Sequence, residues 1–328
     1  MYKLLTGFMI LSLCWAGCHQ PESKRDPSIA RDSLKSLPVV LITRTGNIDG
    51  TLSIPVSQKP MTLVVIVAGS GRTDRDGNNS MGINASPYRM LADSLYRAGI
   101  ASLRYDKRGV GNSQSALKSE SQLTFDNYID DAAAWVDTLR KDKRFNHIVL
   151  LGHSEGSLIG MVAAQRSGCD AFISVAGAGR SIDQLLQEQI QAKVPKSALD
   201  TAERVLQSLR AGKMDTALST NWQSLFRPSV QPYLISWMKY DPAKEIMKLK
   251  VPVLLLQGTT DMQVSVHDVK LLSNTDTKAT LNIIVGMNHV LKPAPPDQKA
   301  NMATYSNPTL SLHPGLMPPI LKFIQSIQ

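Results

Sequence analysis

The pentapeptide GHSEG at residues 152–156 constrains the fold of this chain more than any other segment. It directly follows a β-branched apolar run at 147–151 and directly precedes a helical pattern at 156–165. A strand-to-helix turn of this kind is so tight that side chains at its two glycine positions would collide with neighbouring backbone, and it holds the serine hydroxyl exposed. The segment therefore predicts an elbow that presents Ser154 as a nucleophile. The alternative is a tight glycine turn with an incidental serine.

Short apolar runs alternate with helical patterns along most of the chain. The predicted strands span residues 63–68, 100–105, 147–151, 171–176, 253–257 and 281–285. The predicted helices span residues 87–98, 125–140, 156–165, 266–273 and 318–327. The strand runs lack polar alternation, which is typical of sheets covered on both faces. We therefore expect an α/β fold with a doubly wound, mostly parallel sheet, whose ligand would bind beyond the carboxyl ends of the strands.

Three segments depart from this rhythm. Residues 38–57 contain two β-rich runs around 47–50 and predict an N-terminal antiparallel hairpin. Residues 181–249 read as helices without a strand, so we expect an inserted helical lid there. The α/β core would then consist of 38–180 and 250–328. The Pro-rich segment within the second part, from Lys292 to Asn307, looks like a loop.

The lid segment is rich in aromatic side chains. Five of the 18 aromatic residues of the chain fall in one 19-residue stretch of this segment. We expect four of them, Trp222, Phe226, Tyr233 and Trp237, to line a substrate pocket above Ser154. The alternative is that they only attach the lid helices to the core.

Residues 1–18 have the pattern of an export signal. Lys3 is followed by about a dozen apolar residues, too few to span a bilayer. Small residues then precede Cys18, which predicts lipidation of that cysteine as in bacterial lipoproteins, although Trp15 stands where a leucine is usual. Ordinary cleavage nearby is the alternative. The polar segment 19–37 would be a linker, and the expected location is the cell envelope, membrane-anchored or else periplasmic or secreted.

Composition and charge exclude several classes of protein. The apolar fraction of 43% argues against disorder, and three cysteines argue against a disulfide scaffold. The net charge is +9, but the basic residues are interspersed with acidic ones and no basic tract with aromatics appears, so we expect no nucleic-acid partner. The sequence contains no metal-binding motif, so we expect neither a metal nor another cofactor.

A nucleophilic serine needs a base, and the base needs an orienting acid. Three histidines follow Ser154, namely His267, His289 and His313. His289 follows the predicted strand at 281–285 across a three-residue turn at 286–288, which would bring it to the carboxyl edge of the sheet, so we take it as the base. His267 within a helical pattern and His313 near the C-terminus remain alternatives.

The acid should follow another strand. Asp261 lies just after the predicted strand at 253–257, whereas Asp268 falls on the next helix and Asp241 precedes the strand. We therefore assign the acid to Asp261, with a plain helix-terminal carboxylate as the alternative.

Attack by a serine nucleophile also needs two backbone N–H groups that stabilise the oxyanion as it forms. One donor would be the residue after the nucleophile, Glu155. The other would be Ser70, in the glycine-rich loop that follows the predicted strand at 63–68. A simple surface turn is the alternative for this loop.

Five motifs in this order resemble those of α/β-hydrolases, and more narrowly of bacterial serine esterases of the dienelactone-hydrolase-like and serine-aminopeptidase-like branch. They are GSGRTDRDGN at 69–78, YDKRGVGNS at 105–113, GHSEG at 152–156, GTTDMQV at 258–264 and GMNH at 286–289. The resemblance covers about residues 61–291. It implies the α/β-hydrolase fold and a Ser154–Asp261–His289 triad. We interpret Asp106 and Arg108 in the second motif as structural residues that tie loops together.

The implied activity is hydrolysis of carboxylic esters with small or medium acyl groups, through an acyl-enzyme on Ser154. The partner would be a small-molecule ester, and the oligomeric state is left open. A peptidase or amidase, or a thioesterase or lactonase, on the same triad is the alternative, and a non-catalytic binding protein with a vestigial triad is a third possibility. Substrate choice depends on side chains whose positions the sequence does not reveal.

Overall fold

The computed structural model describes residues 36–216 and 218–327. The predicted export signal, Cys18 and most of the predicted linker lie outside the described residues. The strands are β1 (Ser36–Thr43), β2 (Gly46–Ser53), β3 (Met61–Val67), β4 (Ala101–Tyr105), β5 (Phe145–His153), β6 (Ala171–Val175), β7 (Val253–Gly258) and β8 (Thr280–Ile284). The helices of the core are α1 (Pro87–Arg97), α2 (Phe125–Leu139), α3 (Glu155–Arg166), α9 (Val266–Thr275), α10 (Gln298–Ala303) and α11 (Met317–Ser326).

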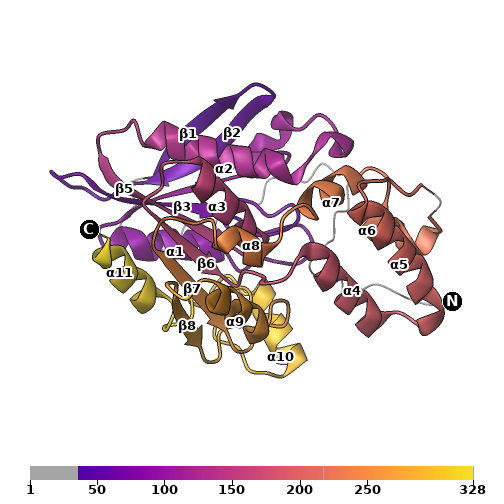
Figure 1. Cartoon of the computed structure of the whole chain (residues 1–328). Coiled ribbons are helices and arrows are strands. Elements are labelled where there is room, and N and C mark those ends of the chain that lie inside the picture. Colours follow the sequence, from indigo (N-terminus) through magenta and orange to yellow (C-terminus); the bar gives the residue numbers. More distant parts are fainter. Residues whose placement is uncertain (1–35, 217, 328) are drawn as a thin grey trace.

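The strands form one eight-stranded sheet in the order β1-β2-β4-β3-β5-β6-β7-β8. The β1–β2 and β2–β4 pairs are antiparallel, and every pair from β4 to β8 is parallel. Helices α2 and α3 cover one face of the sheet, and α1 and α11 cover the other (Figure 1). The predicted doubly wound sheet with an N-terminal hairpin is therefore confirmed.

The central strands are buried because both faces of the sheet are covered. All nine residues of β5 except Asn146 and His147 are buried, as are all those of β4, β6 and β7. This explains why these strands appear in the sequence as continuous apolar runs rather than as alternating ones.

The hairpin turn lies earlier than the sequence suggests. Arg44 and Thr45 connect β1 to β2, whereas residues 47–50 belong to β2 itself. Ile48 is fully buried and Gly50 pairs with Tyr105 of β4. The Asn-Ile-Asp-Gly segment has turn-like composition, but the sheet takes it up as a strand because its pairing with β4 and the burial of Ile48 outweigh that local preference.

The described residues between β6 and β7 form helices and connecting loops. These are α4 (Ile182–Lys193), α5 (Lys196–Arg210), a 3₁₀ turn (Thr220–Trp222), α6 (Gln223–Phe226), α7 (Gln231–Trp237) and α8 (Pro242–Ile246). Figure 1 shows α4, α5 and α6 grouped to one side of the sheet, while α8 lies near α3. Across residues 36–216 and 218–327, no helix is both long and apolar enough to cross a bilayer.

The segment from Lys292 to Asn307 is not only a loop. Asp297 caps the helix α10 by accepting a hydrogen bond from the N–H of Ala300, and a short 3₁₀ turn follows at Thr304–Ser306. The prolines that suggested a loop lie before this cap, where they do not interrupt the helix.

Candidate active site

Ser154 occupies a strained turn between β5 and α3. Its φ of 56° and ψ of −122° are sparsely populated for a residue with a side chain. The flanking glycines make this turn possible. A Cβ added at Gly152 would lie 2.1 Å from the carbonyl oxygen of Gly156, and one added at Gly156 would lie 2.3 Å from that of Val67. The elbow that the pentapeptide predicts is therefore the local conformation at Ser154.

Asp261 and His289 form a buried pair. Nδ1 of His289 lies 2.8 Å from Oδ2 of Asp261, and their side chains are 6% and 1% exposed. An ionised carboxylate only accepts hydrogen bonds, so Nδ1 carries a proton, and in the neutral imidazole Nε2 has the lone pair. The imidazole thus has the tautomer that a general base needs.

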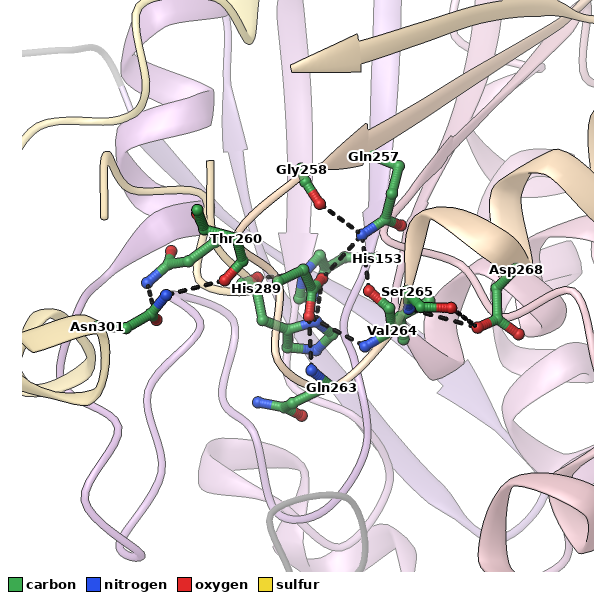
Figure 2. Close-up of polar contacts among 12 residues, drawn as sticks. His153, Gln257, Gly258, Thr260, Gln263, Val264, Ser265, Asp268, His289 and Asn301 are labelled. Carbon is green, nitrogen blue, oxygen red and sulfur yellow. Dashed lines mark hydrogen bonds and ion pairs between the residues drawn. The ribbon is translucent and has the colours of Figure 1, made fainter. Parts of the chain in front are cut away.

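Asp261 is held as an anion by four donors. Its Oδ1 accepts from the backbone N–H groups of Gln263 and Val264, at 2.8 and 3.0 Å. Its Oδ2 accepts from Nε2 of Gln257 at 3.2 Å, in addition to the bond from His289. Figure 2 shows Gln257, Gln263 and Val264 gathered around His289. Burial opposes ionisation, but His289 and the two backbone donors outweigh it and lower the pKa of Asp261.

The loop of His289 is anchored by α10, which the sequence did not predict. The Asn288 side chain donates to Asn301 at 3.1 Å and to Thr304 at 2.6 Å, and it accepts from the N–H of Lys292 at 3.0 Å. Asn301 in turn donates to the carbonyl oxygen of Thr260 at 2.8 Å (Figure 2). One short helix therefore holds both the acid loop and the base loop.

His153, the residue before Ser154, makes two polar contacts. Its Nδ1 lies 2.8 Å from Oη of Tyr88, and its Nε2 lies 2.8 Å from the carbonyl oxygen of His289. That carbonyl can only accept, so Nε2 of His153 donates and Nδ1 accepts from Tyr88. Burial and the neighbouring His289 lower the pKa of His153 to about 3, which keeps it neutral.

The predicted nucleophile and both predicted oxyanion donors face one cavity. Its lining comprises Ser70, Ser154, Glu155, Leu158, Ala178, Arg180, Ile182, Leu185, Trp237, Pro242 and Val264. Within the described part of the chain, the N–H of Ser70 donates to no other group. Among the same residues Ser154 Oγ also makes no hydrogen bond, so the Asp261–His289 pair is not joined to the serine by one.

The four predicted pocket aromatics have different environments. Trp237 lines the cavity and also stacks on Phe125, with ring centroids 5.2 Å apart. Trp222 and Phe226 contact each other at 5.8 Å and are not part of the cavity lining. Tyr233 is buried behind the cavity and donates from its hydroxyl to Oε1 of Glu155 at 2.8 Å.

The other candidates for base and acid are not part of the Asp261–His289 pair. His267 is exposed on α9, and Nδ1 of His313 accepts from the N–H of Gly315 at 3.1 Å. Asp268 is fully buried and pairs with Arg180, while Asp241 caps α8 through the N–H of Ala243. Within residues 36–216 and 218–327, no three His, Cys, Asp or Glu side chains are grouped so that they could hold a metal ion.

The residues of the second motif that we interpreted as structural lie in ion pairs away from the cavity lining. Arg108 bonds Asp131 through Nη2 at 2.5 Å and Nε at 3.1 Å. Asp106 accepts from Arg75 at 2.6 Å. Lys107, the residue between Asp106 and Arg108, instead contacts Gly69 and Glu155. Its position in the sequence does not indicate these contacts.

Comparison with known proteins connects the chain to hydrolases. Residues 80–238 match the family model of the serine aminopeptidase S33 domain. The chain is 27% identical over 247 residues to esterase EstD of Thermotoga maritima, a match that covers 74% of this chain and 57% of that esterase. This chain therefore aligns with little more than half of that relative.

Solved structures share the fold at low sequence identity. Est1E from Butyrivibrio proteoclasticus superposes with a TM-score of 0.55 at 16% identity, covering 88% of this chain and 98% of that one. The Pyrococcus furiosus esterase Pf2001 superposes with a TM-score of 0.54 at 13% identity, covering 89% and 93%. Together with the sheet order and the elbow at Ser154, these similarities show that the chain has the α/β-hydrolase fold.

Proposed function

We propose that this protein is a serine hydrolase that cleaves carboxylic esters of small or medium acyl groups, with Ser154 as nucleophile, His289 as base and Asp261 as the orienting acid. The single observation that carries the proposal is the buried Asp261–His289 pair beside the strained serine elbow. Its tautomer leaves Nε2 of His289 ready to accept a proton. The hydrogen bond from Ser154 to His289 would form with substrate in place, since such bonds are often long in the free enzyme.

In this mechanism His289 takes the proton of Ser154 as Oγ attacks the ester carbonyl. The carbonyl oxygen becomes an oxyanion, and the N–H groups of Ser70 and Glu155 stabilise it. His289 then gives its proton to the leaving alcohol as the C–O bond breaks, and an acyl-enzyme remains. Water adds to the acyl-enzyme by the same route, with His289 again as base, and the carboxylic acid and free Ser154 are released.

The nature of the cavity supports esters with a compact acyl group. Most of its lining is apolar, from Leu158, Ala178, Ile182, Leu185, Trp237, Pro242 and Val264. Its cavity volume of about 30 Å³ favours short acyl chains over long ones. Est1E, which shares the fold, has been solved with ferulic acid bound, and this is consistent with a small ester as substrate.

A peptidase or amidase on the same residues is the second candidate. The match of residues 80–238 to the serine aminopeptidase family model favours it. Both reactions use an acyl-enzyme and differ in the leaving group, so p-nitrophenyl esters and aminoacyl p-nitroanilides distinguish them. We expect kcat/KM to be higher on the esters, and the reverse ratio would assign the chain to the peptidases.

The experiment that tests the proposal combines covalent labelling with turnover. A fluorophosphonate should label the wild-type protein once, on Ser154, and short-chain p-nitrophenyl esters should be hydrolysed. Ser154→Ala should lose the label and about four to six orders of magnitude of kcat, with an unchanged circular dichroism spectrum. Full turnover in folded Ser154→Ala would refute the proposal.

We also propose that the protein is anchored in the cell envelope by a lipid on Cys18, and that residues 181–249 act as a lid over Ser154. The apolar segment and small residues before Cys18 support the first of these. The presence of Ile182, Leu185 and Trp237 in the cavity wall supports the second.

A further inference from the structure

A buried ion pair lies directly behind the two proposed oxyanion donors. Nζ of Lys107 is 2.6 Å from the carbonyl oxygen of Gly69 and 3.4 Å from Oε1 of Glu155. The two side chains are only 1% and 2% exposed. Lys107 also lies over the ring of Tyr128, 4.7 Å from its centroid. Lys107 takes no direct part in the proposed reaction steps.

Such a pair is not explained by stability alone. Moving an ammonium and a carboxylate out of water costs several kcal/mol for each ion, and a well-packed apolar pair is often as stable. Burial lowers the pKa of Lys107, although Glu155 opposes that shift.

The carbonyl of Gly69 and the N–H of Ser70 belong to one peptide group. Because that group is planar and trans, fixing its oxygen also fixes the direction of its N–H on the opposite side. A cation at the oxygen also polarises the peptide and strengthens the N–H as a donor. Lys107 therefore acts on the proposed oxyanion donor without touching substrate.

The loop that holds this peptide is close to the nucleophile. A Cβ added at Gly69 would lie 3.2 Å from Cβ of Ser154. The N–H of Gly69 donates to Oη of Tyr88 at 3.0 Å, so the residue is fixed through both its N–H and its carbonyl. A small rotation of the Gly69–Ser70 peptide would thus redirect the Ser70 N–H relative to the Ser154 hydroxyl.

The other end of the ion pair belongs to the second donor. Glu155 would supply its own backbone N–H to the oxyanion, and its side chain accepts from Lys107 and from Tyr233 of α7. The pair therefore links the loop after β3 to the first residue of α3. These two segments are the ones whose N–H groups must converge on one oxygen.

We propose that Lys107 is a positioning residue for the oxyanion hole, which orients and polarises the Gly69–Ser70 peptide while Glu155 holds the ammonium in place. This inference rests on the proposed function. It predicts a contribution that arises only when negative charge develops on the substrate oxygen, and hence an effect on kcat rather than on KM.

The test compares three variants with the wild-type protein. Lys107→Met removes the charge and keeps an unbranched side chain that is one atom shorter. Lys107→Met/Glu155→Gln also removes the carboxylate that would otherwise be left unpaired. Arg108→Met is the matched control, because it removes the next buried cation, which likewise binds a carboxylate, Asp131, and a backbone carbonyl, that of Ala116.

The measurements are kcat and KM on a short-chain p-nitrophenyl ester, the inhibition constant of a trifluoromethyl ketone, and the melting temperature. Enzyme concentrations are corrected by complete fluorophosphonate titration. We expect both Lys107 variants to lose roughly 10- to 100-fold in kcat, with KM within about threefold of wild type. Binding of the trifluoromethyl ketone, which forms an oxyanion on Ser154, should weaken by the same factor, whereas the matching methyl ketone should not.

The control and the Ser154→Ala variant separate the possible outcomes. Arg108→Met should lower the melting temperature and retain wild-type kcat. If the single Lys107 variant does not fold, the double variant decides the matter, because it has no unpaired buried carboxylate. A kcat within about twofold of wild type in either folded Lys107 variant, or a loss that appears equally in Arg108→Met, would overturn the inference. Turnover that survives in Ser154→Ala would instead overturn the proposed function on which it rests.

Discussion

The imidazole of His153 donates a hydrogen bond from Nε2 to the carbonyl oxygen of His289, 2.8 Å away. The two residues are 136 positions apart in sequence, and their rings lie 4.8 Å apart. Because Nδ1 of His153 accepts from Tyr88, and Tyr88 accepts from the N–H of Gly69, a continuous chain of hydrogen bonds links the oxyanion loop to the loop of the proposed base.

This arrangement predicts a pH-dependent stability. The pKa of His153 is about 3 in the folded protein, against an ordinary value of 6.5. Between these values the unfolded chain binds more protons than the folded chain, so the free energy of unfolding falls as the pH falls. At about pH 4.5 the loss from this one residue should be about 3 kcal/mol relative to neutral pH.

Urea unfolding of wild type and His153→Gln at several pH values measures this effect. The glutamine variant should be less stable at neutral pH but should show a shallower decline between about pH 6.5 and 4.5. His267→Gln is the matched control, because His267 is exposed, and it should keep the wild-type slope. Identical slopes in wild type and His153→Gln would show that His153 is not held neutral in the folded protein.

Substitution of the proposed base should be nearly as damaging as loss of the nucleophile. His289→Ala should lower kcat by about four to six orders of magnitude, whereas Asp261→Asn should cost less, because the acid orients the imidazole and does not itself transfer a proton. Ester hydrolysis and fluorophosphonate labelling rates measure both. His313→Ala is the control and should remain active. An inactive His313→Ala beside an active His289→Ala would reverse the assignment.

The aromatic residues of the proposed lid should separate into two kinds. Trp237 lines the cavity, so Trp237→Phe should change the preferred acyl length, with one methylene worth about 1–3 kcal/mol of discrimination. Trp222 packs against Phe226 outside the cavity lining, so Trp222→Ala should lower stability by about 3–5 kcal/mol and leave relative rates across a chain-length series unaltered. Equal losses on every ester in Trp237→Phe would remove its role in specificity.

The proposed lipid anchor predicts where the mature protein is found. Acylation of Cys18 should bring it to the membrane fraction, and Cys18→Ser should release or mislocalise it. Cys169→Ser is the control, because that cysteine is buried in the folded domain and should not affect fractionation. Mass spectrometry that finds an unacylated N-terminus at another residue would rule out the anchor.

The sequence by itself determined the alternation of strands and helices, the elbow at Ser154 and the places of Asp261 and His289 just after β7 and β8. These features are local, because a strand that ends at a sheet edge carries the next few residues to that edge wherever the rest of the chain lies. The turn of the first hairpin and the helix α10 were missed, since pairing with β4 and a single capping aspartate overcame the local composition.

Only the tertiary structure decided what surrounds these residues. Lys107 reaches Gly69 across 38 positions, Tyr88 reaches His153 across 65, and Tyr233 reaches Glu155 across 78. No periodicity or motif spacing specifies such contacts, because they depend on how separate loops meet once the sheet has formed. The same holds for the proposed lid, where packing left Trp237 in the cavity wall and gave Tyr233 a polar contact with Glu155.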